Sequence, residues 1–220
     1  MLPLWDIGPT VKFPFWVIFI ITLNIFVFYL ELTVPDLDLF ITQYALIPST
    51  VNFMQLGTLT PFVTSLFLHG GFLHIISNMW FFWIFGDNVE YKLGDLFFPV
   101  FYLAAGIAGN FLQYMLMPHS PIPALGASGA IAGTLGAYYA FFPKNRVKTL
   151  VFFLIADLPA SLVLFYWLIL QLFNSAEAVS PAAAASSSGG TAYFAHIGGF
   201  AAGWLVGKLI VLANVEKLKN

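Results

Sequence analysis

Cysteine is absent from the 220-residue chain, and only 8% of its residues are charged. The absence of cysteine excludes a scaffold held together by disulfides. The scarcity of charge excludes a water-soluble globule, because soluble domains carry about 25% charged residues. Eight Lys and Arg residues and a net charge of −2 form no basic surface for DNA or RNA, so no nucleic-acid partner is expected.

Hydrophobic residues make up 60% of the chain, and its mean hydropathy is +0.89. A helix needs about 20 apolar residues to cross a lipid bilayer. Six apolar stretches are that long or nearly so: 13–32, 72–89, 96–117, 127–142, 149–173 and 193–213. We therefore predict an all-α membrane protein, a single domain over 1–220 with six transmembrane helices, and no cleavable signal peptide at its start.

Two longer connections have distinct compositions. Segment 33–71 is broken by Pro35, Pro48 and Pro61, which predicts a loop lying in the membrane interface and not a further span. Segment 174–192 is rich in Ala, Ser and Gly, which predicts an external cover loop.

The positive charges predict the orientation, since Lys and Arg near span ends stay in the cytoplasm. If the N-terminus is cytoplasmic, so are all eight basic residues, whereas 33–71, 118–126 and 174–192 contain none. Both termini are therefore predicted to be cytoplasmic. The basic residues are Lys12, Lys92, Lys144, Arg146, Lys148, Lys208, Lys217 and Lys219.

The fourth span opens with Gly126-Ala127-Ser128-Gly129, and the sixth contains His196 within Ala195-His196-Ile197-Gly198-Gly199. Small residues at such spacing are typical of close helix packing, and a lone histidine is also compatible with a hydrogen-bonding strut. However, Ser128 and His196 are expected at similar depth near the outer face, and a serine becomes a nucleophile when a base lies beside it. We predict a Ser128–His196 pair.

His74 and Asn78 stand four residues apart in the second span, so they share one helix face at the depth of Ser128. With the Ser128 backbone N–H, they would supply donors to a developing oxyanion. The alternative is polar contact between helices. Asp157 is predicted to lie in the middle of the fifth span, too deep to reach His196.

A zinc protease would need a helical His-Glu-x-x-His motif, and an aspartyl protease would need two carboxyls that face each other within the membrane; the sequence offers neither. We expect no metal and no cofactor.

Taken together, HGGFLHIISN at 69–78, Gly86 with Glu90, GASG at 126–129 and AHIGGFAAG at 195–203 resemble the signature of the rhomboid family of intramembrane serine proteases. The resemblance covers roughly 59–207. It implies Ser128 as nucleophile, His196 as general base, and His74 and Asn78 at the oxyanion hole. It also implies supporting roles for His69, Gly126 and Gly129, and for Gly86 and Glu90 at the inner end of the second span. Where rhomboids often carry an aromatic residue that stacks on the base, this chain has Ala132.

The resemblance implies a serine endopeptidase that cuts single-span membrane proteins near their outer end, and we expect it in the cell membrane of a prokaryote. The alternative is a catalytically silent relative that binds membrane clients without cutting them, and a transporter ranks third. The sequence carries no sign of an oligomeric state.

Overall fold

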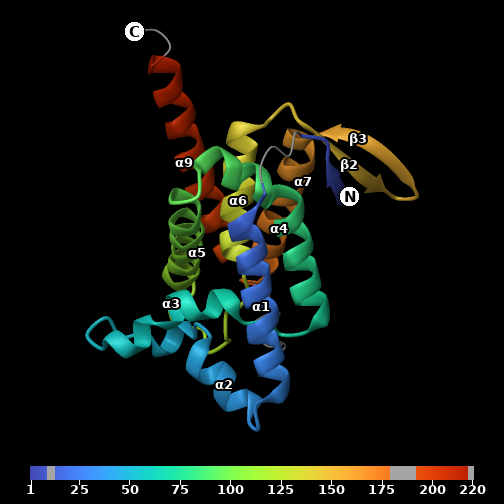
Figure 1. Cartoon of the computed structure of the whole chain (residues 1–220). Helices are drawn as coiled ribbons and strands as arrows, with labels where there is room; N and C mark the ends of the chain where they lie inside the picture. Colours follow the sequence, from blue (N-terminus) through green and yellow to red (C-terminus); the bar gives the residue numbers. More distant parts are fainter. Residues whose placement is uncertain (9–12, 179–191, 218–220) are drawn as a thin grey trace.

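The computed structural model describes residues 1–8, 13–178 and 192–217 (Figure 1). Six helices form the bundle, and a small sheet and several short helices flank it. The six are α1 (Phe15–Thr33), α4 (Phe72–Leu93), α5 (Phe97–Leu116), α6 (Ser128–Phe141), α7 (Ala160–Ala178) and α9 (Tyr193–Lys217).

Five of these helices match the predicted apolar stretches to within a few residues, but the prediction of a span over 149–173 is wrong in its first part. Residues 146–159 form a hairpin of β2 (Arg146–Val151) and β3 (Leu154–Pro159), and α7 begins only at Ala160. Strand β1 (Leu2–Asp6) pairs antiparallel with β2, which gives the order β1-β2-β3. Hydropathy alone did not separate hairpin from helix, because both are apolar here.

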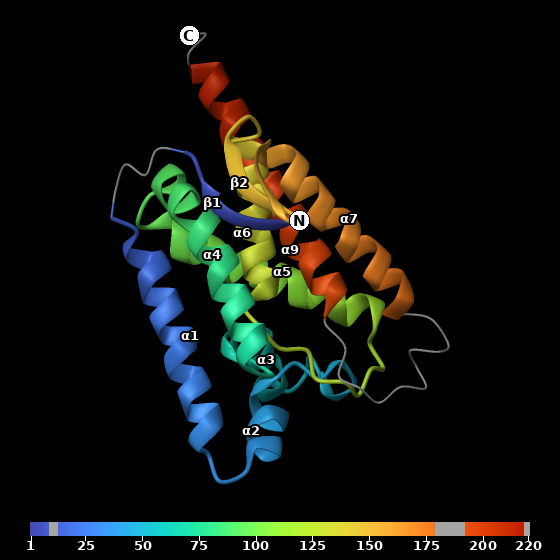
Figure 2. The same cartoon turned by 90° about the vertical axis from the view of Figure 1, so that its right-hand side faces the viewer.

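Successive bundle helices run in alternating directions, so the two ends of the chain lie toward the same end of the bundle (Figures 1 and 2). By length and composition, α1 and Tyr193–Asn214 of α9 qualify as membrane spans within the described ranges. A third qualifies if Leu56–Phe67 and Phe72–Leu93, bent by 77°, count as one span. The fold is thus an apolar helical bundle of the kind that membrane proteins form, and the full count of six spans stays a prediction.

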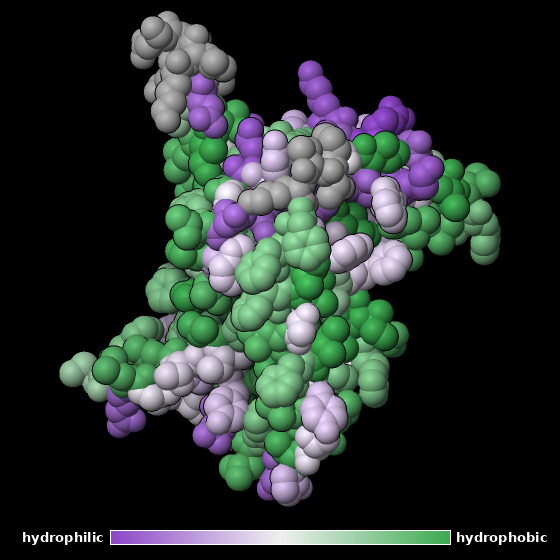
Figure 3. Space-filling view, in the orientation of Figure 1, coloured by the Kyte–Doolittle hydropathy of each residue, from purple (hydrophilic) through white to green (hydrophobic). Residues whose placement is uncertain are grey.

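The described basic residues lie at the end of the bundle where both termini lie. They lie at the C-terminal ends of α4 and α6, on β2 and in the second half of α9: Lys92, Lys144, Arg146, Lys148 and Lys208. Figure 3 shows hydrophilic residues gathered mainly there, above flanks that are largely hydrophobic. This distribution is what the positive charges in the sequence predict.

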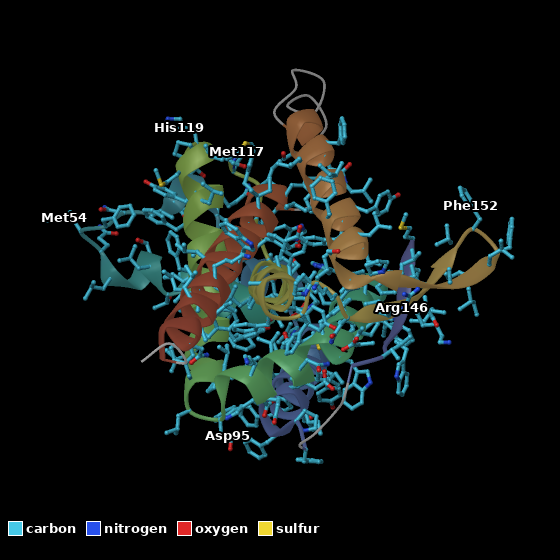
Figure 4. The ribbon with its side chains drawn as sticks, turned by 90° about the horizontal axis from the view of Figure 1, so that it is seen from above. Met54, Asp95, Met117, His119, Arg146 and Phe152 are labelled. Carbon is cyan, nitrogen blue, oxygen red and sulfur yellow. The ribbon has the colours of Figure 1, made fainter. Side chains whose placement is uncertain are left out.

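Helix α6 occupies the centre of the bundle and packs against α4, α5, α7 and α9 (Figure 4). Its contact with α9 is close because both helices present glycine. A Cβ added at Gly199 or Gly203 would overlap the carbonyl groups of Gly129 and Gly133. The small residues therefore do form a helix-packing face, as the pattern indicates.

Segment 33–71 contains short helices at the end of the bundle away from the termini (Figure 1). They are α2 (Leu37–Tyr44), η1 (Pro48–Thr50), η2 (Leu56–Leu59), α3 (Pro61–Thr64) and η3 (Ser65–Phe67). Proline at the first position of η1 and α3 suits a helix start but prevents continuation from the preceding residues. Of the predicted cover 174–192, residues 174–178 extend α7, and 179–191 lie outside the described residues.

Candidate active site

Ser128 and His196 are in contact. Ser128 is the first residue of α6 and His196 lies in the first turn of α9. The Ser128 Oγ atom is 2.6 Å from Nε2 of His196, and the imidazole is buried. The predicted pair of residues is therefore brought together, at the same end of two neighbouring helices.

A cavity of about 420 Å³ opens beside this pair, and residues of four helices line it. The side chains in its wall include His74 and Asn78 from α4, as the i, i+4 spacing indicates, and Trp167 and Gln171 from α7. The complete lining is Leu73, His74, Ser77, Asn78, Phe81, Ser128, Ile131, Leu135, Trp167, Gln171 and His196. Polar groups from separate parts of the chain thus face one space.

Asn78 supplies a free hydrogen-bond donor in this wall. Its side chain is buried, and its Nδ2 atom has no hydrogen-bond partner among the described residues. Buried polar groups are usually paired, because an unpaired one costs about 1–3 kcal/mol. Such a donor beside a nucleophile is available for a group that arrives with the substrate.

His74 lies against Gly126, immediately before the nucleophile. A Cβ added at Gly126 would lie 2.7 Å from Nε2 of His74, and the φ of +123° at Gly126 is one that residues with a Cβ rarely adopt. The Gly126 N–H donates to the Ser65 carbonyl at 2.9 Å. Glycine at this position therefore lets the chain turn into α6 with the imidazole close to Ser128.

Gln171 holds His196, a contact that the sequence analysis missed. Its Oε1 lies 2.7 Å from Nδ1 of His196, and its Nε2 donates to the Trp167 carbonyl at 3.4 Å. Because Oε1 accepts, Nδ1 carries the proton and Nε2 is left to accept from Ser128. A glutamine within the apolar run of α7 was the available signal.

Aromatic contacts to His196 also come from elements other than the position of Ala132. The Trp167 ring centroid is 5.9 Å from that of His196 at an interplanar angle of 36°, and Tyr193 makes an edge contact at 6.1 Å. Ala132 is buried inside the bundle. The aromatic support expected from α6 is thus provided by α7 and by α9 itself.

His69 lies behind the cavity and not in its wall. It is buried, and its ring meets that of His74 edge to face, with centroids 5.2 Å apart. Its backbone N–H donates to both carboxylate oxygens of Glu31 on α1, at 2.9 and 3.2 Å. Glu31, which no motif in the sequence indicated, is thus a buried carboxylate that ties α1 to the segment preceding α4.

At the other end of α4, Gly86 and Glu90 join this helix to α1. The Glu90 carboxylate accepts hydrogen bonds from the Trp16 and Val17 N–H groups at 3.0 and 2.9 Å. A Cβ at Gly86 would lie 2.8 Å from Cγ2 of Val17. Both residues therefore hold the end of α4 to which the family resemblance assigns them.

The predicted mid-span position of Asp157 is wrong, because this residue lies on β3. It pairs in register with Lys148 of β2, and the Lys148 Nζ is 3.5 Å from its carboxylate. His119 lies in the loop between α5 and α6 (Figure 4). Within the described ranges, no three His, Asp or Glu side chains gather as metal ligands.

The sequence matches the model of the Rhomboid domain over residues 56–213. This chain belongs to the rhomboid family. It is 33% identical over 130 residues to the bovine mitochondrial presenilin-associated rhomboid-like protein, covering 58% of this chain and 33% of that protein. It is 33% identical over 162 residues to mitochondrial Rhomboid protein 1 of Saccharomyces cerevisiae, covering 72% of this chain and 43% of that one.

A bacterial relative is the rhomboid protease GluP of Bacillus subtilis, 40% identical over 84 residues, or 38% of this chain and 16% of that protein. The chain thus matches less than half the length of each of these three relatives. The family supports an integral membrane protein and a protease.

Proposed function

We propose that the protein is an intramembrane serine endopeptidase in which Ser128 is the nucleophile and His196 the general base. The observation that carries the proposal is the 2.6 Å contact between Ser128 Oγ and His196 Nε2 at the wall of an open cavity. A serine hydroxyl is a weak nucleophile unless a neighbouring base takes its proton.

The hydrogen-bond pattern supports a direction for that proton transfer. Gln171 accepts from Nδ1 of His196, so Nε2 accepts the Ser128 proton as Oγ attacks the peptide carbonyl carbon. As the C–N bond breaks, the protonated imidazole gives its proton to the amine that leaves. Water then attacks the acyl-enzyme ester by the same route and restores Ser128.

The charge that develops on the carbonyl oxygen needs donors. Asn78 offers an unused Nδ2 donor in the cavity wall, His74 lies beside Gly126, and the Ser128 N–H points from the N-terminus of α6. These groups support an oxyanion hole, which stabilises the transition state more than the bound substrate. The carbonyl of Gly129 lies against Gly199 of α9, where an added Cβ would overlap it, so the start of α6 and α9 pack closely beside the site.

The surroundings of the cavity support a membrane-embedded substrate. The cavity lies among α4, α6, α7 and α9, so a single-span membrane protein would enter sideways past α7 and the segment that follows it. A peptide bond inside a stable helix is inaccessible, so the segment must unwind before Ser128 attacks. Helix-breaking or small residues near the outer end of a substrate helix favour this unwinding.

We further propose six spans with both termini cytoplasmic. The alternating helix directions and the basic residues at one end support this topology. A reporter fused after Asn220 should be cytoplasmic, and one inserted within 180–190 should be external. An external C-terminus would overturn the topology.

We also propose that the protein resides in the plasma membrane of a prokaryote. A prokaryotic plasma membrane is compatible with the Bacillus relative, whereas two other relatives are named as mitochondrial proteins. Fractionation of the native cells tests this placement.

The decisive experiment is cleavage of a model single-span protein by the purified protein in vesicles, with Ser128→Ala as control. Native protein should release two fragments and Ser128→Ala none. Intact substrate that co-purifies equally with both proteins would instead indicate the non-cleaving client binder. Equal cleavage by both would exclude Ser128 as the nucleophile.

A further inference from the structure

The turn between β2 and β3 is made of two phenylalanines. Val151 pairs with Leu154, so Phe152 and Phe153 form a two-residue hairpin loop. Phe152 adopts a φ of 54°, in the left-handed region that such turns usually fill with glycine or asparagine. For a bulky residue this backbone conformation is strained, so local turn geometry does not account for phenylalanine here.

The hairpin tip is highly exposed as well as apolar. The exposed fractions are 88% for Phe152, 96% for Phe153, 75% for Leu154 and 61% for Ile155. Phe152 lies far to the side of the bundle when the molecule is viewed along its helices (Figure 4). In Figure 3 the tip is the hydrophobic projection on the right, level with the hydrophilic end. Contiguous apolar patches of this kind mark interaction sites.

The base of the same hairpin is basic. Arg146 and Lys148 lie on β2, and both contact Asp157 of β3: the Arg146 guanidinium donates to its carbonyl at 2.6 Å, and Lys148 approaches its carboxylate. Both basic side chains are exposed. The hairpin therefore presents an apolar tip and a cationic base at the end of the bundle where positive charge gathers.

Tryptophan side chains lie beside the sheet at this end of the bundle. Trp5 of β1 and Trp83 of α4 are both exposed and line one small pocket, while Trp80 Nε1 donates to the Pro3 carbonyl at 2.9 Å. Tryptophan is enriched where a membrane meets water, because its ring is apolar and its N–H is polar. The sheet is thus fixed to α4 beside residues suited to the bilayer surface.

We propose that the β2–β3 hairpin inserts its tip into the lipid surface beside the bundle. Phe152, Phe153, Leu154 and Ile155 enter the boundary between headgroups and acyl chains, and Arg146 and Lys148 bind the headgroup phosphates. Lipid is the occupant that the charges favour, because phosphates complement a cationic base while acyl chains accept the apolar tip. The sideways direction of the hairpin keeps the tip in the plane of such a surface.

Absence of cysteine makes a direct test practical. Phe153→Cys and, separately, Ile155→Cys would each be labelled with an environment-sensitive fluorophore in the full chain. The proteins would be reconstituted into vesicles of phosphatidylcholine and phosphatidylglycerol. Lys144→Cys, exposed at the same end of the bundle, is the matched control. Neither test position has the positive φ of Phe152, so the strained turn is kept.

Quenching would be measured with aqueous iodide and with lipids that carry a spin label on the headgroup or along the acyl chain. The proposal predicts strong quenching by the lipid labels and weak quenching by iodide at 153 and 155, with the reverse at 144. Iodide quenching at 153 and 155 equal to that at 144 would overturn it. Shielding from both quenchers would also overturn it, because a second copy or another protein would then cover the tip.

Discussion

The Oε1 atom of Gln171 lies 2.7 Å from Nδ1 of His196 and joins α7 to the base on α9. The two residues are 25 positions apart, and the contact sets which imidazole nitrogen faces Ser128. Because α7 also forms part of the cavity wall, the helix past which the substrate is proposed to enter is the one that orients the base.

Gln171→Leu should therefore lower kcat and leave KM nearly unchanged. A hydrogen bond contributes about 0.5–1.5 kcal/mol net, so we expect kcat to fall roughly three- to tenfold. Gln171→Glu keeps an acceptor at Nδ1 and should retain more activity than the leucine variant. Asn174→Leu, one turn further along α7, is the control. A raised KM with unchanged kcat would assign Gln171 to substrate binding instead.

The dyad can be tested by a double-mutant cycle. Ser128→Ala and His196→Ala should each lower kcat/KM by roughly 10³-fold or more, and the double variant should be no slower than either single variant. This result follows because the two groups act as one unit in a single proton transfer. Additive losses, measured on variants with native melting temperature, would contradict the assignment.

Asn78→Ala separates transition-state stabilisation from helix packing. If Nδ2 donates to the oxyanion, kcat should fall roughly 10²–10³-fold while KM and the melting temperature change little. His74→Ala should change the kinetics in the same sense. Ser77→Ala, the adjacent cavity residue, is the control and should keep kcat. A variant of Asn78 that melts earlier but keeps kcat would reassign the side chain to packing.

Glu90→Ala should act on stability. Its carboxylate accepts two N–H groups at the start of α1, and removing both bonds should lower the free energy of unfolding by about 2–4 kcal/mol. Thermal melting in detergent checks this loss, with the exposed neighbour variant Tyr91→Phe as control. Because Glu90 is remote from the cavity, the folded fraction should keep native kcat. Unchanged melting would show that solvent satisfies these N–H groups equally well.

The amino-acid sequence alone determined the apolar helices α1, α4, α5, α6 and α9, since long hydropathic runs encode them directly. It also determined the one-sided distribution of positive charge. The residues of the Ser128–His196 pair could be identified because a polar group within an apolar helix stands out from its neighbours. Glycines that follow each of these two residues within its own span indicated that the two helices meet.

Only the tertiary structure decided which polar groups meet across distant segments. Gln171 against His196 and Glu31 against His69 depend on how helices rotate about their axes, which hydropathy does not encode. The hairpin at 146–159 was misjudged as helix because apolar content alone does not distinguish the two. There β2 pairs with both β1 and β3, so its backbone N–H and C=O groups are hydrogen-bonded to other strands. Because β1 is far away in the sequence, local hydropathy does not reveal this pairing.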